Sequence, residues 1–174
     1  ETLTDRLLWP ISVTSRVGAH MMVRDSTHSR TSLTLNNYYP GFTLPIMECS
    51  SGKAYMAFCT DAEREHLLEG LRTIEGAAEK MATLLLSNDS LLKDIRRNGY
   101  ATQSRNAYTA NPGKTSSIAV PIFRGEEVSG AIVIIFFAVA MTMEQAVERF
   151  LAPLHETARA ITAELSSQAE AARV

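Results

Sequence analysis

Two long apolar segments joined by a short polar turn constrain the fold more than any other feature of the sequence. SIAVPIF (117–123) and VSGAIVIIFF (128–137) flank the tetrad RGEE, and this pattern predicts a β-hairpin. Residues 131–137 are apolar at every position, so we expect a central strand that helices cover on both faces. Pro121 has no backbone N–H, which predicts an unpaired edge or a bulge beside it in the first strand.

Shorter patterns before the hairpin predict two more strands and several helices. Residues 19–24 and 31–36 alternate apolar and polar side chains, as two antiparallel strands would, and the turn-forming NNYYPGF follows them. Helices are expected at 51–59, at 61–71 (where Thr60 and Glu63 have capping-box spacing), at 77–86, and at 90–98 with Gly99 just beyond its end.

The rest of the chain completes an α+β pattern. Residues 100–103 are expected to begin a strand and 111–116 to form a loop. Thr142 and Gln145 have capping-box spacing at the start of a last helix, whose apolar residues recur every three or four positions. Pro153 should kink this helix because it has no N–H to donate. We therefore expect an α+β domain with a largely antiparallel sheet and helices packed on it.

The composition fits a single soluble globular domain over residues 1–174. The chain is 45% hydrophobic and 21% charged with a net charge of −2, so it lacks the basic surface typical of nucleic-acid binding. The cluster Lys93, Arg96 and Arg97 is interpreted as a solvated helix face. The longest uncharged run, 128–143, is shorter than the about 20 apolar residues that a membrane-spanning helix needs, so we expect no membrane association.

Cysteine and histidine usage predicts no metal site and no other cofactor. The 2 cysteines form no CxxC pair and the 4 histidines lack ligand spacing. We expect reduced thiols and a cytoplasmic location. Since the chain begins with Glu1 rather than Met, we also expect further sequence upstream.

The stretch CSSGKAYMAF (49–58) is the best candidate for chemistry, and it allows more than one interpretation. A phosphate-binding loop is excluded because Met47 and Ala54 stand where that motif needs Gly and Ser or Thr. Ser50 and Lys53 match the S-x-x-K of serine hydrolases, but the accompanying S-D-N and K-T-G motifs are missing. The small residues could instead admit an anion to the N–H groups at a helix start. The plain alternative is that a serine merely caps the helix.

Three blocks in order resemble the effector-binding domain of the IclR family of bacterial transcriptional regulators. They are LPIMECSSGKAYMAF, DIRRNGYA and SSIAVPIFRGEEVSGAIVI, and the similarity extends over residues 19–165. The segment LLWPISVTSRVGAHMMVRDSTHSR looks most like the subgroup that regulates catabolism of phenylpropionate-type acids. The resemblance implies a GAF-like domain with about five to six strands, no catalysis, and a small-molecule carboxylate effector. It also implies an upstream winged helix-turn-helix domain that binds DNA, and a homodimer or homotetramer.

The resemblance also implies a set of ligand-binding residues. Ser50 and Ser51, in the turn before the helix, would offer backbone amides and hydroxyls to the carboxylate. The further implied positions are Gln103, Ser116, Ser117, Leu35, Val133 and Ile135. Relatives with small polar effectors carry hydroxyls where Val133 and Ile135 stand, so the resemblance favours an aromatic acid, whereas the residues by themselves favour plain core packing. Two further points stay open: Tyr38, Tyr39 and Phe42 either line a pocket mouth or cover the core, and Lys53 either neutralises the ligand or pairs with an acid.

Overall fold

The protein is built on one antiparallel sheet of six strands in the order β3-β2-β1-β6-β5-β4. The computed structural model describes residues 3–34, 38–72, 89–109 and 111–171. All five pairs of neighbouring strands are antiparallel, which confirms the predicted α+β class and sheet type. The strands are β1 (Ile11–Val17), β2 (His20–Ser26), β3 (Thr43–Pro45), β4 (Ala101–Gln103), β5 (Thr115–Arg124) and β6 (Glu127–Phe137).

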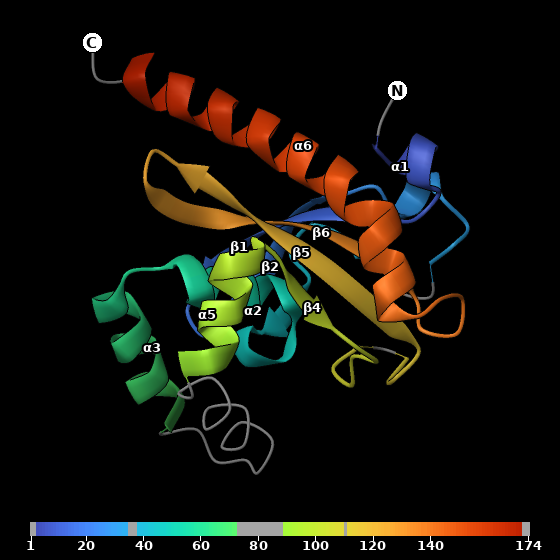
Figure 1. Ribbon diagram of the computed structural model, residues 1–174, viewed down its shortest axis with the longest axis horizontal. Coiled ribbons are helices and arrows are strands. Elements are labelled where there is room, and N and C mark those ends of the chain that lie inside the picture. The colour runs from blue at the N-terminus through green and yellow to red at the C-terminus, as the bar shows by residue number, and fades with distance from the viewer. Residues whose placement is uncertain (1–2, 35–37, 73–88, 110, 172–174) are drawn as a thin grey trace.

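Helices cover both faces of the sheet (Figure 1). The long helix α6 crosses one face, and α2 packs against the other with α5 beside it. The helices are α1 (Leu3–Leu7), α2 (Ser50–Phe58), α3 (Asp61–Arg72), α5 (Asp89–Asn98) and α6 (Met143–Ala171), with 3₁₀ turns η1 (His28–Arg30) and η2 (Ile46–Glu48). The helix expected at 77–86 lies outside the described residues.

The predicted hairpin is the centre of the molecule. In β6, Ile132, Ile134 and Phe136 belong to the apolar cluster under α6, while Val133 and Ile135 belong to the cluster under α2. Successive side chains of a strand point to opposite faces, so a strand that is apolar at every position must be covered twice. The prediction of a central strand is therefore confirmed.

Pro121 lies where the sequence predicts an unpaired edge. β4 pairs with β5 only at residues 117–119, so Pro121 has a strand neighbour on the β6 side but none on the β4 side. The pairing of β5 with β6 also shifts in register just after Ile122. Both expected irregularities are thus present.

The helix ends follow the predicted capping chemistry, with one difference. Thr142 and Gln145 form a complete capping box. The N–H of Gln145 donates to Thr142 Oγ1 at 3.3 Å, and the N–H of Thr142 donates to Gln145 Oε1 at 2.9 Å. At α3, Thr60 Oγ1 accepts from the N–H of Glu63 at 3.2 Å. The Glu63 carboxylate accepts instead from Tyr55 Oη at 2.7 Å and from Arg16 at 3.0 Å, so it ties α3 to α2 and β1.

Pro153 lies inside α6 as expected. Figure 1 shows the first turns of α6 at an angle to the rest of the helix. Thr157 Oγ1 donates to the Pro153 carbonyl at 3.0 Å. A side-chain donor thus takes part in the hydrogen bonding of the turn that contains the proline.

The prediction of a strand at 31–36 was wrong for the residues that the structure describes. Residues 31–34 form no strand, and 35–36 lie outside the described part of the chain. Thr31 Oγ1 accepts from the N–H of Leu33 at 3.0 Å, a local bond of the kind that competes with a β-ladder. β2 pairs instead with β1, through a turn at Gly18 where φ is +58°, and on its other side with β3.

Candidate functional site

A small cavity of about 30 Å³ lies between the start of α2 and the sheet. Apart from Thr4 and Ser116, the buried polar residues of the described chain all line it. The lining consists of Ser12, Thr14, Val23, Tyr38, Leu44, Cys49, Ser50, Ser51, Asn106, Thr115, Ser117, Val133 and Ile135. A space of this size holds about one water molecule. Buried hydroxyl groups from α2, β1 and β5 therefore converge on this space.

The first turn of α2 supplies the electrostatics of this cavity. Cys49, the N-cap residue, is extended with φ −133° and makes no side-chain capping bond. The first N–H groups of a helix have no acceptor within the helix and carry partial positive charge. Ser50 and Ser51 lie in this turn and line the cavity. Among the residues that line it none is charged, so an anion here would be held by amides and hydroxyls.

Short hydrogen bonds fix the serines in place. Ser50 Oγ lies 2.8 Å from Ser117 Oγ and connects α2 to β5. Ser51 Oγ lies 3.3 Å from the sulfur of Cys49. Burial raises the pKa of the Cys49 thiol, with Ser51 and nearby Lys53 acting in the opposite direction, so this sulfur stays protonated and uncharged at neutral pH.

Gly52 brings the start of α2 against η2. A Cβ at this position would overlap the carbonyl oxygen of Ile46 and would lie 2.5 Å from its carbonyl carbon. The N–H of Ile46 in turn donates to Ala19 at 3.0 Å, in the β1–β2 hairpin turn. The glycine of SSGK thus allows a close approach of two backbones.

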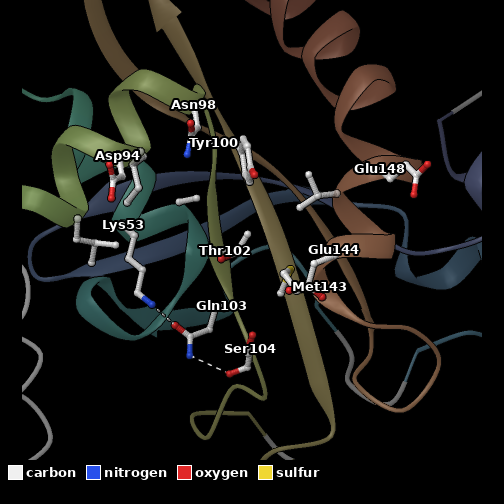
Figure 2. Close-up of a pocket in the computed structure, with 14 residues that line it drawn as sticks. Lys53, Asp94, Asn98, Tyr100, Thr102, Gln103, Ser104, Met143, Glu144 and Glu148 are labelled. Carbon is white, nitrogen blue, oxygen red and sulfur yellow. Dashed lines mark hydrogen bonds between the residues drawn. The ribbon is translucent and has the colours of Figure 1, made fainter.

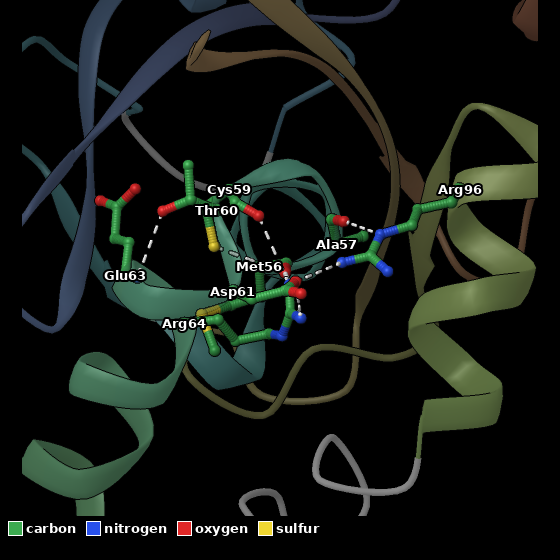
Figure 3. Close-up of polar contacts among 8 residues, drawn as sticks. All are labelled: Met56, Ala57, Cys59, Thr60, Asp61, Glu63, Arg64 and Arg96. Atoms are coloured by element: carbon green, nitrogen blue, oxygen red, sulfur yellow. Dashed lines mark hydrogen bonds and ion pairs between the residues drawn. The ribbon is translucent and has the colours of Figure 1, made fainter.

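Two arginines hold the other end of α2 (Figure 3). Arg64 of α3 donates to the carbonyls of Met56 and Cys59 at 3.4 Å each, and Arg96 of α5 donates to the carbonyl of Ala57. Asp61 accepts from Arg64 and lies 3.8 Å from Arg96. Cations suit the negative end of the helix dipole. Arg96, which the sequence analysis assigned to a solvated face, therefore has a structural role.

The structure brings five of the eight predicted ligand-binding residues to the cavity, namely Ser50, Ser51, Ser117, Val133 and Ile135. Ser116 faces the opposite side of the sheet, where its Oγ accepts from the N–H of Arg105 at 3.0 Å. Neighbouring residues of a strand cannot share a face. Leu35 lies outside the described residues.

Gln103 lies in a separate groove together with Lys53 (Figure 2). Lys53 Nζ donates to Gln103 Oε1 at 2.6 Å, so its partner in the structure is an amide and not the acid considered from the sequence. Burial lowers the pKa of Lys53. Ser50 is paired with Ser117, and the two residues of the S-x-x-K pattern thus take part in different contacts.

Sequence reasoning missed Ser12 and Thr14, which β1 carries to the floor of the cavity. The signal was the alternation of apolar and hydroxyl side chains in ISVT, at residues 11–14. Of the three aromatic candidates, Tyr38 lines the cavity with its ring 5.7 Å from that of Phe42. Tyr39 is 53% exposed.

No group of three His, Cys, Asp or Glu side chains in the described part of the chain is placed to hold a metal ion. Within the same residues, every helix is too short or too polar to cross a membrane.

An antiparallel sheet with helices on both faces and a polar cavity at a helix start defines a GAF-like regulatory domain. The chain belongs to the family of bacterial transcriptional regulator IclR C-terminal domains, which matches residues 1–163. It is thus the regulatory domain of a transcriptional regulator.

Solved structures share the fold. The C-terminal domain of Escherichia coli KdgR has a TM-score of 0.72 at 22% identity, over 94% of this chain and 92% of that one. The Thermotoga maritima IclR has a TM-score of 0.74 at 22% identity, over 94% of this chain and 64% of that one. A C-terminal domain of a putative Vibrio cholerae regulator has a TM-score of 0.71 at 21% identity, over 91% and 88%. The chain thus spans about two thirds of the Thermotoga protein.

Proposed function

We propose that this domain senses a small carboxylic acid, which binds in the cavity at the start of α2. The proposal rests on one observation. The start of α2 and several buried hydroxyl groups line the same cavity, and the described lining residues include no charged side chain. A carboxylate there accepts hydrogen bonds from N–H groups and hydroxyls without changing its covalent bonds. The proposed role is therefore binding and not catalysis.

The apolar part of the lining favours an acid with an aromatic or other apolar body. Val133 and Ile135 lie on the sheet side of the cavity, and Tyr38, Val23 and Leu44 also line it. A mostly apolar cavity with a few convergent polar groups is the usual form of a small-molecule site. Phenylpropionate-type acids combine both features, in agreement with the subgroup that the N-terminal segment resembles.

The cavity must expand to accept such a ligand. At about 30 Å³ it holds no molecule larger than water, so binding requires lining residues to move apart. A ligand shifts a conformational equilibrium only by its difference in affinity for the two states. We propose that the expanded state changes how copies of the chain assemble, and so controls an upstream DNA-binding domain.

A thermal-shift comparison of matched acids and amides tests this function. The chain is heated with 3-phenylpropionate, benzoate, pyruvate and the uncharged amide of each. A ligand at 100 times its Kd stabilises a protein by about 2.7 kcal/mol, which raises the Tm of a domain of this size by roughly 5–11 °C.

At least one acid should raise the Tm, and its amide should have a much smaller effect. Equal shifts with acid and amide would contradict recognition of the carboxylate. The absence of any shift across the panel would contradict the proposed function.

A further inference from the structure

A second, larger hollow lies on the opposite edge of the molecule from β3, along the outermost strand β4. It is a groove of about 770 Å³ with α5 on one side and the start of α6 on the other (Figure 2). Five consecutive residues, 100–104, line it, so the backbone of β4 itself forms the floor. The walls are Leu91, Asp94, Ile95 and Asn98 of α5 and Met143, Glu144, Val147 and Glu148 of α6.

The floor presents backbone groups that point away from the sheet. The N–H of Asn106 donates to the carbonyl of Thr115 at 2.8 Å, so the odd-numbered residues of β5 turn their backbone groups towards β4. Ala119 and Ser117 then pair with Ala101 and Gln103. In an antiparallel ladder the intervening residue directs its N–H and C=O the other way. Thr102 therefore offers a donor and an acceptor to the groove.

The adjoining part of the same edge is closed. Beyond β4, Pro121 has no N–H, the N–H of Phe123 donates to Thr162 Oγ1 at 3.1 Å, and that of Gly125 donates to Ser166 Oγ at 3.3 Å. Proline and side-chain caps are the usual protection of a sheet edge against pairing. The carbonyl of Ser104 accepts from Gln103 Nε2 at 3.1 Å, which leaves Thr102 as the candidate position for pairing with another strand.

The side chains on the walls of the groove indicate which side chains an added strand would carry. Apolar side chains face it from both helices, with Leu91 on α5 and Val147 on α6. Glu144 lies on the α6 wall and the groove's cation, Lys53, is bound to Gln103, whereas the Glu148 carboxylate, one turn further along α6, points away from the groove (Figure 2). An added strand would direct alternate side chains to the two walls.

We propose that this groove binds an extended, basic segment of another protein, which adds to β4 as a seventh strand. Main-chain bonds to Thr102 would supply affinity, and a basic side chain facing Glu144 would supply specificity. A second copy of this chain fits less well, because two copies paired through β4 would bring their acidic α6 walls together. This inference does not depend on the proposed carboxylate site.

Selection from a random heptapeptide library displayed on phage, with the 174-residue chain as target, tests the proposal. Enriched peptides should carry Lys or Arg at alternate positions. Fluorescence anisotropy then compares each synthetic peptide with versions that are N-methylated at single positions. Methylation at the residue paired with Thr102 should weaken binding at least tenfold, and methylation at the next residue should change it little.

Matched variants of the protein separate the groove from the general charge. Glu144→Gln should weaken binding several-fold, whereas Glu148→Gln, on the same helix but with its carboxylate directed away from the groove, should leave it unchanged. Failure to enrich any peptide, or equal effects of methylation at all positions, would overturn the proposal. Self-association in sedimentation experiments that Thr102→Pro abolishes would also overturn it, because a second copy would then occupy the edge.

Discussion

Gly52→Ala should destabilise the domain far more than a single methyl group usually does. The new Cβ would overlap the carbonyl oxygen of Ile46 and would lie 2.5 Å from its carbon, where normal carbon contacts are about 3.5–4.0 Å. The first turn of α2 must therefore shift away from η2 to relieve both contacts. Such overpacking costs about 1–3 kcal/mol, and loss of the Ser50–Ser117 bond adds about 1 kcal/mol.

Gly70→Ala is the matched control. Gly70 lies inside α3, and nothing lies within 4 Å of the Cβ that alanine would add. Alanine in a helix interior is favoured over glycine by about 0.5–1 kcal/mol, so this variant should be more stable. Urea unfolding followed by circular dichroism measures both variants. Equal or greater stability of Gly52→Ala relative to the unmodified chain would refute the close packing of α2 on η2.

Three further predictions concern a helix cap, a thiol and a serine. Thr142→Ala should lower the unfolding free energy by about 1 kcal/mol in urea titrations, since it removes one half of the capping box, and an unchanged midpoint would contradict that role. Burial raises the pKa of Cys59 from 9.0 to about 11, so the stability that its protonated form contributes is present below pH 9 and is lost as the pH rises towards 11. Iodoacetamide at pH 8.5 should accordingly label Cys59 much more slowly in the folded chain than in urea, and similar rates would be inconsistent with burial. A fluorophosphonate probe should leave Ser50 unmodified by mass spectrometry, since its hydroxyl is paired with Ser117 rather than with a base.

Patterns that reflect the local chain alone were read correctly from the sequence. The β5–β6 hairpin follows from two apolar runs and a turn, and the cap of α6 from Thr142 and Gln145. Helix α2 was expected because small and apolar residues follow Ser50. These features need no knowledge of distant residues, which is why the sequence suffices for them.

Features that depend on contacts across the sheet were harder to predict. β1 was missed because Ser12 and Thr14 place hydroxyls on a buried face, where the usual pattern has apolar side chains. Ser116 and Ser117 were both assigned to the ligand, but strand geometry allows only one of them to face α2. Which one it is depends on the register of β5 with β6, and the sequence leaves that register open.

¹H–¹⁵N correlation spectra can detect the proposed contact between an acid and the first backbone amides of α2. The labelled chain is titrated with 3-phenylpropionate, and separately with 3-phenylpropionamide as the uncharged control. We expect the amide signals of Ser50 and Ser51 to move most, towards higher proton frequency, and the uncharged compound to move them little. Saturable shifts confined to other parts of the chain, with Ser50 and Ser51 unmoved, would contradict the proposed contact.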